Sequence, residues 1–259
     1  MIKLPGDNGA ASPRLSIITV VRNDAVGLQR TLASVSRWKG GRTEYLIIDG
    51  ASTDGTLQVV EAYRALVDHL LSEPDNGIYD AMNKGIALAR GDFLLFLNAG
   101  DELLVDPEEL LDGCGDTTVL VYGRANMRNP DGSLSYVKGK RLKSNFRFFK
   151  GMPLCHQAIL YRREAMVPFD TAFRIMADRV STWQLLRRYG LRRSRFVDRI
   201  MVNYYEGGFS GSLPPSVWQE EEDRFYRLAG VPWYRYKKQV NRLFKERVRI
   251  PLKRLLKRD

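Results

Sequence analysis

The sequence predicts an α/β fold with a mostly parallel central sheet, followed by a basic helical tail. From Leu15 to Leu97, short apolar runs alternate with segments whose apolar residues recur every three or four positions. Polar loops of a few residues separate these segments. This order is typical of β-α-β units, in which consecutive strands lie parallel and helices cover both faces of the sheet.

Each element of the first half has its own signal. Apolar runs predict four strands, at Leu15–Val21, Tyr45–Ile48, a run ending at Leu70-Leu71, and Phe93–Leu97. Helical spacing predicts three helices, marked by Leu28, Leu32 and Val35, by Leu57 and Val60, and by Ile78, Met82, Ile86 and Ala89. Asp54 lies where the N-cap of the second of these helices is expected.

The second half is less regular. Further strands are predicted at residues 119–122, 158–161 and 201–205, and a helix at residues 179–189. Asn129-Pro130-Asp131-Gly132 is a turn signal between two possible hairpin arms. Pro214-Pro215 marks a boundary, so we expect a catalytic domain over residues 13–212 and a separate tail over residues 213–259.

Composition narrows the class of protein. The 259 residues are 44% hydrophobic, which is enough for a large core. Cys114 and Cys155 have no CxxC spacing, which argues against a disulfide framework or a zinc knuckle. No run approaches the ~20 apolar residues of a membrane span, and the amino terminus lacks the apolar segment of a signal peptide. We therefore expect a cytoplasmic protein.

The positive charge is concentrated in the tail. Of the net +11, residues 233–259 contribute eleven Lys or Arg against two acids, which leaves only +2 for the preceding 232 residues. Val240, Leu243, Phe244 and Val248 form an apolar stripe, preceded by aromatic residues and flanked by basic ones. This pattern predicts a helix that binds the anionic inner face of the cell membrane. Nucleic acid is the less favoured partner, and packing against the body is the plain alternative.

Three polar loops follow the predicted strands. They are Arg22-Asn23-Asp24, Asp49-Gly50-Ala51-Ser52 and Asn98-Ala99-Gly100-Asp101. Ligands of open α/β sheets bind outside the carboxyl ends of the strands, so we expect the site there. The GxGxxG fingerprint and the GxxxxGK[ST] loop are both missing after the first strand, which argues against ordinary dehydrogenases and P-loop enzymes.

Six stretches, in order, resemble the family 2 glycosyltransferases. They are SIITVVRND, YLIIDGASTDGT, SEPDNGIYDAMNKGIALARGDFLLFLNAGDELL, CHQAILYRRE, FRIMADRVSTWQLL and EGGFSGS. The resemblance implies the nucleotide-diphospho-sugar transferase (GT-A) fold, within a subgroup of bacterial enzymes that build exopolysaccharide, O-antigen or capsule units. It spans about Leu15 to Ser212, so the tail lies outside it.

The resemblance also implies a nucleotide-sugar site on these loops. Asp49 matches the carboxylate that accepts a hydrogen bond from the base, with Ser52 beside it; an ionised carboxylate can only accept. The positions that match the cradle for base and ribose are Thr19, Val21 and Asn23. Lys84 resembles a basic position near the diphosphate. The alternatives are plain strand and turn residues and a solvated lysine.

At the NAGD loop the family usually has an Asp-x-Asp triplet, and here only Asp101 keeps a carboxylate. We expect Asp101 to bind Mg²⁺ or Mn²⁺, because Mg²⁺ accepts one or two carboxylates together with phosphates and waters. Asn98 would add a neutral oxygen or hold the sugar, and Gly100 would let the backbone approach the ligand. The alternative is a surface turn.

Two further residues take roles from the resemblance. Asp178 matches the general base at the start of a helix, although Arg179-Val180 departs from the aromatic or acidic residues that usually follow; an N-cap role is the alternative. His156 matches a position near the donor sugar and the acceptor, and a structural role is equally open. The other histidine, His69, is interpreted as structural.

Together these features predict a metal-dependent, inverting glycosyltransferase. It would move a sugar from a nucleotide-diphosphate sugar to a glycan acceptor, lipid-linked, in cell-surface polysaccharide synthesis. One rival is a sugar nucleotidyltransferase, which normally has a Gly- and Arg/Lys-rich loop after the first strand, of which VVRNDAVG is a poor version. The other rival is a catalytically inactive assembly partner, because the triplet has lost carboxylates.

Overall fold

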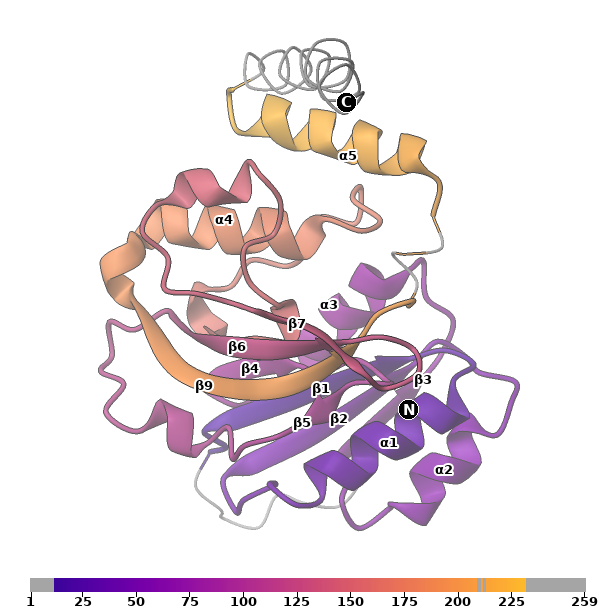
Figure 1. Cartoon of the computed structure of the whole chain (residues 1–259). Helices are drawn as coiled ribbons and strands as arrows, with labels where there is room; N and C mark the ends of the chain where they lie inside the picture. The colour runs from indigo at the N-terminus through magenta and orange to yellow at the C-terminus, as the bar shows by residue number, and fades with distance from the viewer. Residues whose placement is uncertain (1–11, 209–210, 212, 232–259) are drawn as a thin grey trace, which may run out of the picture. The chain divides into compact units, whose positions relative to one another are not determined.

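The computed structural model describes residues 12–208, 211 and 213–231. The chain divides into two compact units, Met1–Ser212 and Leu213–Asp259 (Figure 1). The described helix of the second unit is α5 (Pro215–Leu228). The strands and longer helices of the first unit are, in order, β1 (Leu15–Val21), α1 (Ala25–Val35), β2 (Thr43–Asp49), α2 (Thr56–Ala62), β3 (His69–Ser72), α3 (Ile78–Leu88), β4 (Phe93–Phe96), β5 (Glu102–Leu103), β6 (Leu120–Arg128), β7 (Leu134–Lys138), β8 (Ile159–Arg162), α4 (Ala177–Tyr189) and β9 (Ser194–Tyr205).

The strands form one nine-stranded sheet in the order β3-β2-β1-β4-β8-β6-β9-β5, and β7 pairs with β6 outside this path. β1 is parallel to β2 and β4 on its two sides, and β3 is parallel to β2. β8 runs antiparallel to both β4 and β6. The long β9, which curves across the front of Figure 1, is parallel to β6 and antiparallel to β5. The sheet is therefore parallel in its first half and mixed in its second.

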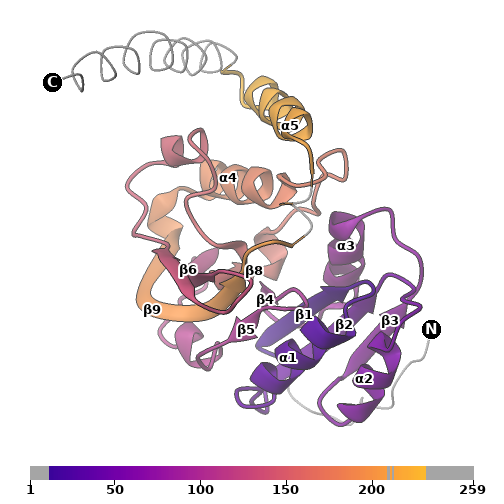
Figure 2. The same ribbon diagram turned by 45° about the vertical axis from the view of Figure 1, so that its right-hand side comes forward.

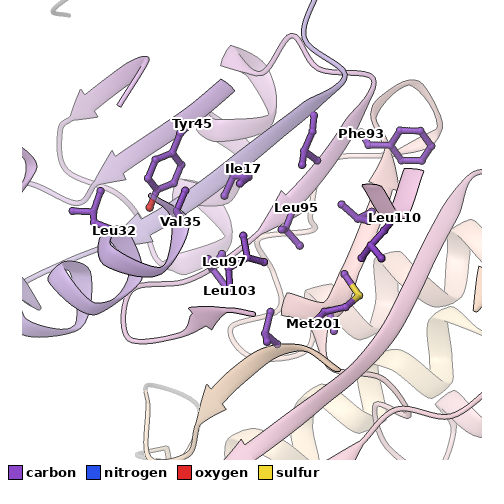
Figure 3. Packing of buried hydrophobic residues seen from close by; sticks show 14 of the residues in the cluster. Ile17, Leu32, Val35, Tyr45, Phe93, Leu95, Leu97, Leu103, Leu110 and Met201 are labelled. Carbon is purple, nitrogen blue, oxygen red and sulfur yellow. The ribbon is translucent and has the colours of Figure 1, made fainter. Parts of the chain in front are cut away.

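Helices cover both faces of the parallel half, because alternate residues of each strand point to opposite faces. Ile17 and Ile47 belong to one buried cluster with Leu32 of α1 and Val60 of α2, part of which is shown in Figure 3. Ile18 points to the opposite face, where α3 packs. Figure 2 shows α3 on one side of β1 and β2, and α1 and α2 on the other.

The approach of α3 to the sheet depends on a glycine. A Cβ at Gly85 would lie 2.5 Å from Cγ2 of Ile18 and 3.4 Å from Cγ1 of Ile48. Real Cβ atoms do not come as close as the first of these distances, so α3 can lie at this depth only without a side chain at position 85. Because α3 carries Lys84 and Tyr79, Gly85 also sets the position of the candidate residue Lys84 and of Tyr79, whose hydroxyl contacts the candidate base Asp178.

The predicted α/β fold is confirmed, and the first-half strands lie where the apolar runs place them. Three local predictions are corrected. Helix α2 has Gly55 rather than Asp54 at its N-cap, and the Asp54 carboxylate, one residue earlier, accepts from the N–H of Thr56 (2.9 Å), the first residue of the helix. Ala158 ends a 3₁₀ turn instead of starting a strand. β9 begins at Ser194 rather than near Met201, because its charged first half pairs with β6 while remaining largely exposed.

None of the described helices is both long and apolar enough to cross a membrane. The apolar stripe over residues 240–248 and the segment from Pro251 lie outside the described residues. The membrane-binding tail therefore stays a prediction, as does the assignment of residues 13–212 to catalysis.

Gly85→Ala should destabilise the protein, although replacing a helical glycine by alanine normally stabilises by up to about 1 kcal/mol. The added methyl group has to displace Ile18 or α3, and such overpacking costs about 1–3 kcal/mol. The free energy of unfolding from urea titration measures the change. Gly41→Ala is the control, since a Cβ there meets nothing within 4 Å. A Gly85→Ala protein as stable as the wild type would contradict the close packing of α3.

Candidate active site

The register of the parallel strands brings the three polar loops to one edge of the sheet. Val21 pairs with Asp49, so β1 and β2 end side by side. β4 pairs with β1 as far as Ile18 and Phe96. After Phe96 the chain continues alongside β1, since the Ala99 N–H donates to the carbonyl of Val20 (3.3 Å). The loops that follow β1, β2 and β4 are therefore neighbours.

Asp49 is fully buried and surrounded by donors. Its Oδ2 accepts from the hydroxyl of Ser72 (2.6 Å) and the N–H of Ser52 (3.1 Å), and its Oδ1 accepts from the Ser52 hydroxyl. Each carboxylate oxygen has two lone pairs, so Asp49 can take a further donor only by sharing an oxygen that is already bonded. These bonds hold the carboxylate in one orientation at the end of β2.

Asn23 and Ser52 join the first two loops. Asn23 has a left-handed backbone (φ 51°), and its side-chain oxygen accepts from the Thr53 N–H (2.8 Å). Its own N–H donates to the Ser52 hydroxyl (2.8 Å), which in turn donates to Asp49. The structure therefore brings Asn23, Asp49 and Ser52 together in one hydrogen-bonded group.

Thr19 and Val21 lie differently, because both point into the core on the α1 side of the sheet. Val21 belongs to the buried cluster, and Thr19 has no exposed surface. The Thr19 hydroxyl donates to the carbonyl of Leu97 (2.6 Å) and lies 3.0 Å from the hydroxyl of Tyr45. Their side chains therefore support the strand ends from within and are not at the loop surface.

Lys84 is engaged by the loop that follows β3. Its Nζ lies 2.7 Å from the carbonyl oxygen of Pro74 and 2.9 Å from a carboxylate oxygen of Glu73, and Asp80 is within 3.8 Å. The side chain is 21% exposed. In this arrangement Lys84 fastens the loop to α3, and it could reach a phosphate only by exchanging these partners.

The NAGD loop is held by a hydroxyl of α1. Gly100 has a positive φ of 97°, a conformation that favours glycine. The hydroxyl of Thr31 accepts from the Gly100 N–H (3.0 Å), and the Asp101 carbonyl is its nearest acceptor (2.7 Å). One side chain therefore binds both ends of the Gly100–Asp101 segment and orients it against α1.

Asp101 is a buried carboxyl group whose lost contact with water is replaced by few hydrogen bonds. It is 4% exposed, and its Oδ1 accepts from the backbone N–H of Tyr205 (3.2 Å). Burial raises the pKa of the Asp101 carboxyl well above its usual value, and the Tyr205 N–H and the charge of Arg30 act in the opposite direction. The Arg30 guanidinium lies over the Tyr205 ring, 4.4 Å from its centre. A cation bound at Asp101 would replace the proton that burial favours.

The NAGD loop could bind a divalent cation through the side-chain oxygens of Asn98 and Asp101. The side-chain oxygen of Asn98 is buried and has no hydrogen-bond partner among the described residues, an arrangement that costs free energy unless a ligand contacts this oxygen. Asn98 and Asp101 would offer one neutral and one acidic oxygen. Among the described residues no group of three or more His, Cys, Asp or Glu could hold a metal. A cation here would need phosphate or water oxygens to complete its shell, as is usual for Mg²⁺.

Asp178 lies half-buried in the first turn of α4. The N-cap of this helix is Met176, so Asp178 does not cap it. The hydroxyl of Tyr79, on α3, donates to Asp178 Oδ1 (2.9 Å). A carboxylate at a helix N-terminus is favoured by the helix dipole. The structure therefore holds Asp178 as an acceptor in a fixed orientation.

His156 lies in a 3₁₀ turn (His156–Ala158) before β8. The imidazole is 6% exposed and stacks on Phe96, with 5.2 Å between ring centres. Burial lowers the pKa of His156, and the charge of Asp178 acts in the opposite direction. Burial therefore favours the neutral form of the His156 ring.

The sequence of the chain and its fold match known proteins. The profile "Glycosyl transferase family 2" matches residues 16–169. Over 215 residues the chain is 33% identical to the PGL/p-HBAD biosynthesis glycosyltransferase of Mycobacterium tuberculosis, which covers 78% of this chain and 81% of that protein. The chain belongs to glycosyltransferase family 2.

Solved structures show that this family 2 glycosyltransferase has the GT-A fold. S. aureus TarS 1–349 in complex with UDP superposes with a TM-score of 0.61 and 19% identity, over 82% of this chain and 64% of that one. Glucosyl-3-phosphoglycerate synthase of M. tuberculosis, in complex with Mn²⁺, UDP and glucosyl-3-phosphoglycerate, gives 0.59 and 15%, over 88% of each chain. At these identities the likeness concerns the fold. The chain spans about 64% of the TarS chain.

Several residues that support the candidate site were not predicted from the sequence. They are Arg30, Thr31, Tyr79, Tyr161, Thr182 and Tyr205. Each acts on a residue of another element, up to 104 positions away. The sequence pattern around them shows only helix and strand faces, so it carries no signal for these contacts.

Thr31→Val should loosen the NAGD loop of this glycosyltransferase. The change keeps the shape of the side chain and removes the hydroxyl, so the Gly100 N–H and the Asp101 carbonyl both lose their partner. Leaving buried polar groups unpaired costs about 1–3 kcal/mol. We expect that loss in the free energy of unfolding, and faster hydrogen exchange at the Gly100 amide. Thr31→Ser, which keeps the hydroxyl, should behave as the wild type; equal effects of the two variants would refute the hydroxyl's role.

Proposed function

We propose that this family 2 glycosyltransferase is an inverting, divalent-metal-dependent enzyme. It would move one sugar from a nucleotide-diphosphate sugar to a hydroxyl group of a glycan acceptor. The observation that carries the proposal is the Asp178 carboxylate, which accepts from the Tyr79 hydroxyl at 2.9 Å and whose charge acts on the pKa of the buried His156. A single oriented carboxylate is what a one-step displacement requires.

The proposed reaction is a single displacement at the anomeric carbon. The acceptor oxygen forms a bond to this carbon while the bond to the diphosphate oxygen breaks on the opposite face, so the configuration inverts. Asp178 takes the proton of the attacking hydroxyl as general base. Tyr79 donates to Oδ1 and holds the carboxylate in one orientation, so that a free lone pair can accept the proton.

The diphosphate would lie at the NAGD loop. Asp101 and Asn98 would hold a divalent cation, Mg²⁺ or Mn²⁺, and a bound cation supplies positive charge to the leaving diphosphate. Support comes from the unpartnered oxygen of Asn98 and from the buried carboxyl of Asp101. Gly100 lets the backbone approach the phosphates. Lys84 would contribute only after exchanging its present partners.

The nucleotide would lie over the ends of β1 and β2. We propose that Asp49 accepts a hydrogen bond from the base, and that Asn23 and Ser52 shape the pocket with it. Thr19 and Val21 would support this pocket from the core. Structural neighbours of the chain have been solved with UDP-GlcNAc, with UDP-Glc and with GDP-Man. A UDP- or GDP-linked hexose is therefore the first donor to test.

The biological setting follows from the chemistry and the tail. We propose that the acceptor is a lipid-linked glycan in cell-surface polysaccharide synthesis, and that the enzyme works at the inner face of the cell membrane. Support comes from the eleven basic residues in positions 233–259. A lipid-linked acceptor stays at the membrane, so an enzyme bound there meets it at a higher local concentration.

Asp178→Asn and Asp101→Ala should separate the two halves of the proposed reaction. Asp178→Asn should keep Mn²⁺-dependent binding of UDP-glucose, UDP-GlcNAc or GDP-mannose, and lower turnover by roughly 10²-fold or more, because only the general base is lost. Asp101→Ala should lose donor binding and turnover together. Thermal shift measures binding, and release of nucleoside diphosphate with and without chelator measures turnover.

The same measurements test the rival functions. A nucleotidyltransferase would form the nucleotide sugar from sugar phosphate and nucleoside triphosphate, and an inactive assembly partner would neither bind donor nor release diphosphate. Equal losses of binding and turnover in Asp178→Asn would make Asp178 a structural residue. Activity of Asp101→Ala within a few-fold of the wild type, still abolished by chelator, would place the cation elsewhere.

Removal of residues 213–259 should release the enzyme from membranes. At about 1 kcal/mol per basic residue near an anionic surface, the tail has ample charge for binding, and the binding should weaken as salt rises. Flotation with anionic liposomes measures this, and nucleotide binding checks that the remaining unit is folded. A full-length control with Lys253, Arg254, Lys257 and Arg258 changed to Gln should bind more weakly. Unchanged flotation after truncation would contradict the proposal.

A further inference from the structure

His156 lies at the end of a buried chain of hydrogen bonds. The imidazole Nδ1 is 3.1 Å from the hydroxyl of Tyr161, which is 2.7 Å from the hydroxyl of Thr182. The Thr182 hydroxyl is 2.7 Å from the backbone carbonyl oxygen of Asp178, one turn earlier on α4. We call these four groups the histidine chain. Tyr161 and Thr182 have no exposed surface, so water does not compete for these bonds.

The direction of every bond in the histidine chain follows from its last member. A carbonyl oxygen only accepts, so the single hydroxyl proton of Thr182 is given to Asp178. Thr182 can then only accept from Tyr161, which uses the single proton of the phenol. The Tyr161 oxygen must in turn accept from His156. Any reversal would leave two oxygens 2.7 Å apart with no proton between them.

The proton of the neutral imidazole is therefore on Nδ1, and Nε2 carries a lone pair. Nε2 is buried, and no described residue forms a hydrogen bond with it. Phe96 and Phe169 enclose the ring, with centre distances of 5.2 Å and 5.7 Å. A buried acceptor without a donor costs free energy, and such an atom in a candidate site indicates a missing ligand.

We propose that Thr182 and Tyr161 fix His156 in the Nδ1–H tautomer, so that its Nε2 is a subsite that accepts a hydrogen bond from a sugar hydroxyl next to Asp178. The identity of the ligand as a sugar rests on the proposed function, whereas the tautomer does not. His156 is the contact residue of this subsite, and Tyr161 and Thr182 are positioning residues that act through it.

The chemistry of the subsite selects a hydroxyl group over an anion. Nε2 and the Asp178 carboxylate are both acceptors, so a phosphate or carboxylate group would be repelled from this place. A neutral hydroxyl donates one hydrogen bond and fits without a change of charge. A substrate that lacks this hydroxyl should bind more weakly, because Nε2 then stays buried and unpaired in the complex.

Nitrogen NMR of the two imidazoles tests the tautomer. The chain has two histidines, so ¹⁵N-labelled full-length protein gives two sets of ring signals, and His69→Gln assigns the remaining set to His156. At neutral pH we expect a protonated Nδ1 and an unprotonated Nε2. Thr182→Val removes the acceptor of Tyr161, whose proton then turns to Nδ1, so the tautomer should reverse. Thr182→Ser keeps the hydroxyl and should restore the wild-type pattern.

Substrate binding tests the hydroxyl subsite separately. UDP-glucose or UDP-GlcNAc should shift the Nε2 signal while UDP alone leaves it unchanged, if the hydroxyl belongs to the donor sugar. If it belongs to the acceptor, the donor leaves Nε2 unchanged and Thr182→Val raises the KM for the acceptor. In either case Thr182→Val should raise the KM of that substrate by a few- to tenfold. Thr182→Ser should have the wild-type KM.

Three results would overturn the proposal. A protonated Nε2 in the wild type, or the same tautomer in Thr182→Val, would show that the histidine chain does not set the proton. Selective broadening of the Nε2 signal by Mn²⁺ alone would make the subsite a metal site. Failure of every sugar nucleotide and acceptor to affect either readout would end the hydroxyl assignment. The first readout needs no activity, so its failure is distinct from a failure of the proposed transferase function.

Discussion

The parallel pairing of β1 with both β2 and β4 is the constraint on which the site depends. Because parallel strands share a direction, the loops after these three strands must meet at one edge, although they come from positions around 22, 50 and 98. The other features follow from that edge. Asn23 and Ser52 close the first two loops over Asp49, and Thr31 binds the third loop to the helix that leaves the first. Gly85 then sets the depth of α3, which brings Tyr79 to Asp178.

The first half of the fold could be predicted well, because β1, β2 and β4 are buried along their whole length and read as largely apolar runs, whereas the short β3 is only partly buried. Asp49 and Asp101 were found for the same reason, since each follows such a run. The orientation of Thr19 and Val21 was missed, although they share a strand face with Ile17, which points to α1. The contacts of Asp101 with Tyr205, and of Asp178 with Tyr79, join residues about a hundred positions apart. No local pattern encodes such pairs, and they appear only once the sheet order is known.

Some acceptors of the candidate site lack donors within the part of the chain that the structure describes. There the buried oxygen of Asn98 and the Nε2 of His156 have no hydrogen-bond partner, and Asp101 is a buried carboxyl that accepts from a backbone N–H. Each arrangement lowers the stability of the protein, since burial removes water without full replacement. A substrate with hydroxyl groups, together with a cation, would supply the missing donors and charge. A local loss of stability within an otherwise well-packed fold is typical of a functional site.

The hydrogen bond between the Asp101 carboxylate and the Tyr205 N–H has a consequence for co-translational folding. The two residues are 104 positions apart. At a synthesis rate of about 5–20 residues per second, Asp101 emerges roughly 5–20 s before its partner. The four parallel strands end by residue 96 and can pair early in that interval, whereas β8, the partner of β4, begins only at Ile159, and β9 ends only at Tyr205. Until β8 emerges, the nascent chain would therefore carry a half-built sheet with an open edge at β4, and an unpaired strand edge of this kind is prone to aggregation.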